Sequence, residues 1–400
     1  MDSDGKAHRP ETAGATESVA RFEIRLTRCL NPDGTPCGEL PPLARDAEAL
    51  RALYRAMVWV RMFDRRAIAL QRTGQLGTYG ASLGQEAVSA ALGCVMRPED
   101  VLLPTYREYA AQFQRGVDPA DILLYWGGDE RGMAFAQGRG VQDFPICIPV
   151  ASHVPHAAGV AFAFKQRREP RVAVCVLGDG GTSKGDFYEA LNVAGAWRLP
   201  LVVLVNNNQW AISVPRAAQS AAQTLAQKAI AAGIPGEQVD GNDVIALCTV
   251  LERALARARS GAGASLIEAL TYRLGDHTTA DDASRYRDEA EVQAAWQREP
   301  LRRLRAWLAA QGGWDEAREK QLLADCEAEV EAAVKRYETV APRTPATMFE
   351  HLYAELPAAY RAQRDALEVG ASSSSLTGET DALAPSLSMG EGGGGGEPTP

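Results

Sequence analysis

The sequence predicts an α/β fold: a doubly wound parallel sheet with helices on both faces, an N-terminal helical arm and helices at the C-terminal end. The main observation is that residues 172–215 contain two apolar runs on either side of an amphipathic segment. Residues 172–177 and 201–205 are expected to be buried strands, and residues 182–199 the helix between them. Further apolar runs alternate with helical patterns along 400 residues, enough for one large α/β core or two modest domains.

The composition narrows the class of protein. A formal net charge of −9 argues against a nucleic-acid partner and against binding to an anionic membrane surface. The seven cysteines are scattered without a C-x-x-C pair, which predicts a reduced, cytoplasmic protein with neither a disulfide scaffold nor a zinc site. No apolar run approaches the length of a membrane span, and the N-terminus has no signal-peptide core.

The remaining elements follow from periodicity and turn signals. Short strands are expected at 22–26, at 101–103, just before 240 and at 265–270. Helices are expected over 46–73, from a cap at Ser82, and over 118–126, 154–168, 217–232, 243–259, 289–339 and 344–367. Four regions result: a disordered N-terminus (1–20), an arm with helices (21–100), an α/β domain with its C-terminal helices (101–368) and a disordered Gly/Ser/Pro tail (369–400).

Polar residues follow both strands of the 172–215 unit. The run from Gly178 to Gly181 contains Asp179 and follows the first strand, and the run Asn206–Asn208 ends the second. A right-handed crossover makes the two strands parallel, so both runs are expected at the sheet edge where open α/β folds bind ligands. One carboxylate and one side-chain amide are hard oxygen donors, which suits Mg²⁺ that keeps phosphate oxygens as further ligands.

Two other interpretations of this unit were weighed. The glycine run lacks the G-x-G-x-x-G spacing of a dinucleotide site. A lone Gly-Asp-Gly is more often an ordinary tight turn. The spacing favours a third interpretation, because 26 residues (181–206 inclusive) lead from the glycine run into the pair Asn207-Asn208, and this combination is the thiamine-diphosphate motif.

With this motif and the segments SKGDFYEALNVAGAW and NNNQWAISVP, residues 22–368 resemble the α subunit of the heterotetrameric E1 component of 2-oxo acid dehydrogenase complexes. The similarity is greatest to the pyruvate dehydrogenase type. The resemblance implies a thiamine-diphosphate-binding fold, Mg²⁺, and an α2β2 assembly with an E1 β subunit. It further implies decarboxylation of the 2-oxo acid pyruvate and reductive acetylation of lipoyl domains of E2. Branched-chain 2-oxo acids remain an alternative substrate class, and a non-catalytic assembly subunit a different class of function.

The resemblance assigns the metal and part of the cofactor site. Asp179, Asn208 and the main-chain carbonyl of Trp210 would hold Mg²⁺, with Gly178, Gly180 and Gly181 beside the cofactor. The chain before residue 101 is predicted to be helical and not a second parallel sheet. The carboxylate that activates the cofactor is therefore expected from the β subunit.

Tyr106 and Arg107, just after the 101–103 strand, match a Tyr-Arg pair that the family places against the diphosphate. On the sequence alone, an ion pair between Arg107 and Glu108 is the simpler interpretation. Ile148 and Val150 flank Pro149 and alone would suggest an edge-strand bend. In the family this segment offers backbone groups to the aminopyrimidine, and its second apolar residue props the cofactor into a bent shape.

His277 lies in the loop 272–282, after the 265–270 strand, among arginine and acidic residues. Such a histidine can be tuned toward neutral pH and exchange protons, although a lone loop histidine is usually solvent-facing. The resemblance makes His277 the catalytic residue of a loop that lines the access channel and contacts the cofactor. A transketolase or decarboxylase fragment would share the metal motif but lack this loop.

Two other polar positions are expected to be structural. Glu86 is expected in the first turn of its helix, where carboxylates are favoured. His153 and His156 bracket a proline before a helix, and their spacing could suggest a metal site. Packing or capping is favoured for them because no nearby Cys, Asp or Glu completes a ligand set.

Overall fold

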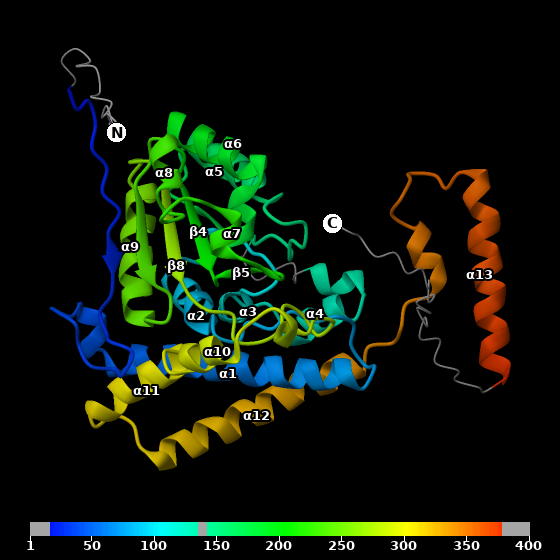
Figure 1. Ribbon diagram of the computed structural model, residues 1–400. Helices are drawn as coiled ribbons and strands as arrows, with labels where there is room; N and C mark the ends of the chain where they lie inside the picture. The colour runs from blue at the N-terminus through cyan, green and yellow to red at the C-terminus, as the bar shows by residue number, and fades with distance from the viewer. Residues whose placement is uncertain (1–16, 135–141, 378–400) are drawn as a thin grey trace, which may run out of the picture. The chain divides into compact units, whose positions relative to one another are not determined.

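A computed structural model describes residues 17–134 and 142–377 (Figure 1). The chain divides into one compact unit that ends at Thr339 and a second that begins at Val340. The predicted N-terminal arm and the main part of the α/β domain thus belong to the same unit. Most of the predicted disordered N-terminus (1–16) and of the predicted tail (378–400) lies outside the described residues.

One six-stranded sheet forms the centre of the first unit, and all its pairings are parallel. Its strands, in spatial order, are β1 (Leu26–Thr27), β7 (Gly236–Asp240), β8 (Ser265–Leu270), β4 (Leu201–Asn207), β3 (Ala173–Gly178) and β2 (Val101–Leu103). The central strands β3 and β4 are buried along nearly their whole length because they are continuous runs of apolar residues. The predicted α/β fold with a parallel sheet is correct.

Helices cover both faces of this sheet. Alternate residues of β3 belong to two separate cores: Val174 and Val176 to one, and Cys175 and Leu177 to the other. The first core is shared with α1 (Ala47–Arg72), α2 (Glu86–Val95), α3 (Tyr109–Gln114), α4 (Pro119–Trp126), α9 (Val244–Arg259), α11 (Pro300–Ala310) and α12 (Glu316–Glu338). The second is shared with α5 (Val154–Arg167) and α6 (Gly185–Ala196), and α12 lies along α1 (Figure 1).

Three helix predictions need correction. Ser82 does not cap α2, because its N–H and hydroxyl both donate to the buried carboxylate of Asp64, at 2.8 Å each. The helix after β3 begins at Gly185, since residues 179–183 form a 3-10 turn. The predicted helix 217–232 is broken into α7 (Arg216–Gln219) and α8 (Lys228–Ala231).

Smaller differences concern the termini of the predicted elements. The 22–26 strand is confined to β1, two residues long. The segment around Pro149 forms no strand. A short antiparallel pair, β5 (Trp210–Ala211) and β6 (Val214–Pro215), follows β4. Helix α10 (Glu289–Trp296) precedes α11, as the 289–339 pattern predicted.

In the second unit the predicted helix 344–367 is replaced by a 3-10 turn, Pro345–Phe349, and a separate helix, α13 (Ala358–Thr377). The rings of Tyr353 and Tyr360 stack at 5.6 Å between centroids within it. Because α13 continues to Thr377, the helix extends past residue 369, where the sequence predicted the disordered tail to begin.

The described residues include all the cysteines and most of the helices that the sequence predicts. All seven cysteines are free thiols. Among the described residues, no helix combines the length and the apolar character needed to cross a membrane.

Candidate active site

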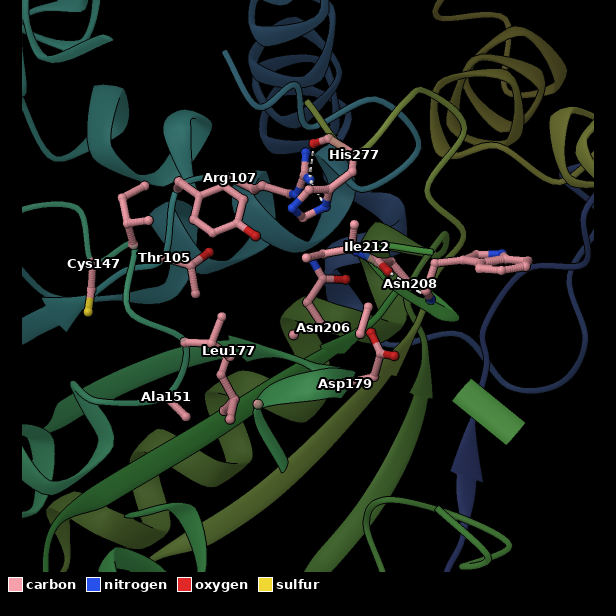
Figure 2. Close-up of a pocket in the computed structure, with 18 of the residues that line it drawn as sticks. Thr105, Arg107, Cys147, Ala151, Leu177, Asp179, Asn206, Asn208, Ile212 and His277 are labelled. Carbon is pink, nitrogen blue, oxygen red and sulfur yellow. Dashed lines mark hydrogen bonds between the residues drawn. The ribbon is translucent and has the colours of Figure 1, made fainter. Parts of the chain in front are cut away.

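A cavity of about 600 Å³ lies at the carboxyl ends of β2, β3 and β4 (Figure 2). It is the place where parallel α/β sheets bind ligands. Every site residue predicted from the sequence lines it: Tyr106, Arg107, Ile148, Val150, Gly178, Asp179, Gly180, Gly181, Asn208, Trp210 and His277. Residues up to 171 positions apart in the sequence are therefore gathered around one space (Tyr106 to His277).

The sheet register brings the predicted metal ligands together. Gly178 at the end of β3 pairs with Asn206 at the end of β4, so Asp179 and Asn208 both continue from neighbouring strand ends. Figure 2 shows Asp179, Asn206 and Asn208 on one side of the cavity. The Oδ1 atom of Asn208 accepts a hydrogen bond from the main-chain N–H of Trp210 at 3.2 Å.

The carboxylate of Asp179 has the surroundings of a cation ligand. Its side chain is buried (3 % exposed), and its only side-chain hydrogen-bond partner among the described residues is Gln219 Nε2 at 3.1 Å. Burial raises the pKa of Asp179 to about 6. A buried carboxylate without a cationic neighbour in contact, next to an amide oxygen, fits a hard divalent ion; the full ligand set remains a prediction.

The glycines of the 178–181 turn serve two purposes. A Cβ on Gly180 would lie 2.6 Å from Ala211 Cβ and would clash, and one on Gly181 would lie 3.0 Å from Leu177 Cδ1, so that the leucine would have to shift. A Cβ on Gly178 would meet nothing within 4 Å. Gly178 therefore leaves open space along the cavity wall, where a ligand can approach the backbone closely.

Arg107 occupies the opposite side of the cavity. Its guanidinium donates to the carbonyl of Ala81, and to the carbonyl of His277 at 2.6 Å. The predicted alternative, an ion pair with Glu108, is not formed, because Glu108 accepts from the N–H and hydroxyl of Thr105 at 2.6 and 2.7 Å. The ring of Tyr106 lies against the guanidinium, 5.1 Å from its carbon.

His277 is held between two arginines. Its Nδ1 lies 3.3 Å from Arg107 Nη2 and 3.4 Å from Arg273 Nη1, and its main-chain N–H donates to Asp281 at 2.8 Å. Because both guanidinium groups can only donate, Nδ1 is the acceptor and the proton of the neutral ring is on Nε2. Burial, followed by the charges of Arg107 and Arg273, lowers the pKa of His277 to about 4. The prediction of a histidine tuned toward neutral pH is wrong for this state.

Ile148 and Val150 present exposed apolar side chains to the cavity, 44 % and 48 % exposed. A Cβ on Gly181 would lie 3.4 Å from Val150 Cγ1, which places Val150 beside the glycine turn. His153 packs as predicted: its ring Nε2 lies 2.6 Å from the carbonyl of Val176 in the interior. Among the described residues there is no cluster of three or more His, Cys, Asp or Glu that could hold a metal.

Two residues of this region, Gln219 and Gln85, were missed from the sequence, and Arg273 was expected only as a charged neighbour of His277. Arg273 is buried and donates to the carbonyls of Trp210 and Ile212, at 3.4 and 2.8 Å, and to the hydroxyl of Tyr286. Gln219 contacts Asp179, and Gln85 contacts Asn208. The only available signal was for Arg273, a basic residue three positions after a strand end; nothing local marks the two glutamines.

The chain was compared with known proteins. The sequence profile of the family described as "Dehydrogenase E1 component" matches residues 54–346. The chain belongs to this family. It is similar to the "Pyruvate dehydrogenase E1 component subunit alpha" of Staphylococcus epidermidis, 40% identical over 344 residues that cover 85% of this chain and 91% of the relative. The proteins of the same name from Staphylococcus aureus strains Mu50 and MRSA252 are 40% and 39% identical over equal coverage. The family resemblance predicted from the motifs is thus confirmed, and the cavity lies within the matched residues.

Proposed function

We propose that this chain is the α subunit of a pyruvate dehydrogenase E1 component. With a β subunit it decarboxylates pyruvate oxidatively and acetylates the lipoyl groups of an E2 partner. The single observation that carries the proposal is the one cavity in which Asp179 and Asn208 face Arg107 and His277. Relatives of 40% identity that carry this name support the same assignment.

The residues present fit thiamine diphosphate with Mg²⁺. Asp179, Asn208 and the carbonyl of Trp210 would hold the metal, and Arg107 would meet the diphosphate. Ile148 and Val150 offer apolar surface to the organic part. Thiamine diphosphate supplies the carbanion chemistry of 2-oxo acid decarboxylation when it is bound.

His277 would serve as the proton-transfer group on this chain. The neutral ring carries its proton on Nε2, and Nδ1 is occupied by the two arginines. An anion bound at Arg107 would offset the positive charge that now lowers the pKa of His277, so its pKa would rise toward the working pH. This is the condition under which a general acid or base is most effective.

In this proposal, the chain supplies only one part of the active site. The described residues contain one large parallel sheet, whose strands continue into Asp179 and Asn208. We propose that a β subunit supplies the carboxylate that activates the cofactor, that the assembly is α2β2, and that it acts in the cytoplasm. Branched-chain 2-oxo acids are a less favoured substrate class, because the similar proteins are named for pyruvate.

The proposal is tested by co-expressing the chain with its β subunit. Turnover of pyruvate and of 3-methyl-2-oxobutanoate is measured with a dye acceptor, with and without Mg²⁺ and thiamine diphosphate. We expect turnover that requires both additions and that favours pyruvate, since pockets that differ by a methylene or two discriminate by about 1–3 kcal/mol. Turnover by the purified α chain alone would contradict the shared site, and equal turnover without cofactor would contradict the function.

A further inference from the structure

Gln85 is buried in the wall of the cavity, immediately before helix α2. Its side chain is 1 % exposed, and the cavity reaches it. Its Oε1 accepts two hydrogen bonds, from Asn206 Nδ2 at 3.1 Å and from Asn208 Nδ2 at 2.9 Å. One amide oxygen just before α2 therefore holds both asparagine amides at the end of β4.

The orientation of these amides is fixed by a group that can only donate. The main-chain N–H of Trp210 lies 3.2 Å from Asn208 Oδ1, so the amide of Asn208 must direct Nδ2 toward Gln85. Gln85 must then present its oxygen and not its nitrogen. Asn206 agrees with this arrangement, because its Oδ1 accepts from the hydroxyl of Thr271 at 2.8 Å.

We propose that Gln85 is a positioning residue for the metal site. By accepting from Asn208 Nδ2, it stabilises the one amide orientation that directs Asn208 Oδ1 toward the cation. The inference rests on the proposed function, in which Asn208 is a metal ligand. The last torsion of asparagine is broad and roughly two-fold, so without Gln85 only the 3.2 Å hydrogen bond from the Trp210 N–H would oppose the reverse orientation.

A second observation marks Gln85 as part of a binding wall. Its Nε2 is buried and has no hydrogen-bond partner within the described part of the chain. A buried amide donor left without a partner is uncommon and costly. Bound diphosphate carries the oxygen acceptors that would satisfy it. Gln85 thus has an acceptor used by the protein and a donor left for a ligand.

The test measures Mg²⁺-dependent thiamine diphosphate binding by calorimetry, with the α chain co-purified with its β subunit. Gln85→Met keeps the length of the side chain but removes the acceptor. We expect it to raise the Mg²⁺ concentration for half-maximal binding about 10-fold, the scale of one hydrogen bond to a site group. Gln85→Glu retains an acceptor for both amides but loses the Nε2 donor, so its affinity for thiamine diphosphate should fall, while the Mg²⁺ concentration for half-maximal binding stays within about 3-fold of the wild type.

The same change is then made in an Asn208→Asp variant, to distinguish an effect on the orientation of the residue 208 side chain from an effect on packing. In Asn208→Asp the two side-chain oxygens are equivalent, so no partner is needed to choose between them. Adding Gln85→Met there should change the Mg²⁺ requirement by less than about 3-fold, a non-additive result expected only for residues that act together. Equal losses in both backgrounds, or an unchanged Mg²⁺ requirement in Gln85→Met alone, would overturn the inference.

The outcomes also distinguish this inference from the proposed function. If the wild-type complex shows no Mg²⁺-dependent binding, the function itself is wrong. If the wild type binds and Gln85→Met binds equally well, only the role of Gln85 is wrong. Assembly with the β subunit and the thermal midpoint without cofactor are compared first. If Gln85→Met fails to assemble, the Mg²⁺ requirement of Gln85→Glu becomes the deciding measurement. A Gln85→Glu requirement raised as far as about 10-fold would then contradict the role of the oxygen.

Discussion

The two sides of the cavity are built in different ways. On one side, Asp179 and Asn208 continue directly from β3 and β4, whose register is set by a ladder of main-chain hydrogen bonds in the core. On the other, His277 lies in the loop after β8 and depends on partners from distant segments. Arg107 holds its carbonyl and ring, and Thr279 exchanges two hydrogen bonds with Tyr79, at 2.9 and 3.0 Å.

The two sides of the cavity are therefore expected to differ in how easily they move. Displacing Asp179 requires the central strands to shift, which would disturb both cores. Displacing His277 requires only that a few loop contacts open, and segments held in this way are the ones that open locally. The side predicted to hold the metal is therefore expected to be preformed, and the side predicted to transfer a proton is expected to change with what is bound.

The strongest test of the rigid side is Asp179→Ala. We expect an intact fold and assembly, but thiamine diphosphate binding weakened more than about 100-fold, since even outer-shell partners of a metal are worth about 10- to 100-fold. Calorimetry with Mg²⁺ present and the β subunit bound provides the measurement. Asp186→Ala, at a partly exposed carboxylate in the first turn of α6 that pairs with Lys184, is the matched control. Wild-type affinity in Asp179→Ala would refute the metal assignment.

The corresponding test of the adaptable side is His277→Ala. Cofactor binding should remain, because Asp179 and Asn208 continue from β3 and β4 and the change leaves Arg273 in place, while reductive acetylation of a lipoyl domain falls about 100-fold or more, the scale of general acid–base groups. The loop should also become less sensitive to protease when Mg²⁺ and thiamine diphosphate are added. Near-normal acetylation together with no cofactor-dependent protection would remove His277 from the site.

The sequence predicts the strand-end side of the cavity better than the side that contains His277. The strands 101–103 and 265–270 and the positions of Asp179 and Asn208 could be predicted, because apolar runs and turn residues are local signals. The low pKa of His277 could not, since it depends on burial by the folded chain and then on Arg107, 170 residues away in the sequence. Gln85 was missed for the same reason: its partners are on β4.

The incorrect helix predictions have tertiary causes as well. The alanine-rich stretch 217–232 has high helix propensity, but Ala226 N–H donates to the buried carboxylate of Glu268 at 2.9 Å. A second contact, from Lys228 Nζ to the carbonyl of Thr182 at 2.7 Å, fixes the following turn. Such tertiary contacts override helix propensity, which is a weak effect, and no sequence pattern within residues 217–232 indicates them.

A smaller effect is expected from Arg107→Gln on the pKa of His277. After burial, the charge of Arg107 is the largest influence that lowers this pKa to about 4, so its removal should raise the value toward 6.5. The value is measured by NMR titration of histidine-labelled α chain in the cofactor-free complex. Arg25→Gln, at an exposed arginine paired with Glu23, should leave it unchanged. An unaltered His277 pKa in Arg107→Gln would show that the two groups are not in contact.

The smallest expected effect concerns Asp64, a buried residue of α1 that contacts the segment following this helix. Its carboxyl accepts from the hydroxyl of Tyr79 at 2.6 Å and from Ser82, and these two residues flank Ala81, whose carbonyl accepts from Arg107. Burial raises the pKa of Asp64 to about 7 from a usual value of 3.8. The folded chain therefore keeps a proton between these two pH values that the unfolded chain has released.

The sign of the resulting pH dependence is determined by this proton. Because the folded state binds more protons than the unfolded state between pH 3.8 and about 7, stability falls as pH rises through this window, by up to roughly 1.4 kcal/mol per pH unit. Asp64→Asn keeps the shape and cannot titrate. Relative to the wild type, its thermal midpoint should therefore be lowest near pH 5 and recover toward pH 8. Asp325→Asn, on the exposed side of α12, should show no such trend. A constant difference between Asp64→Asn and the wild type across this range would mean that Asp64 stays ionised in the folded chain, held by Tyr79 and Ser82 more strongly than burial opposes it.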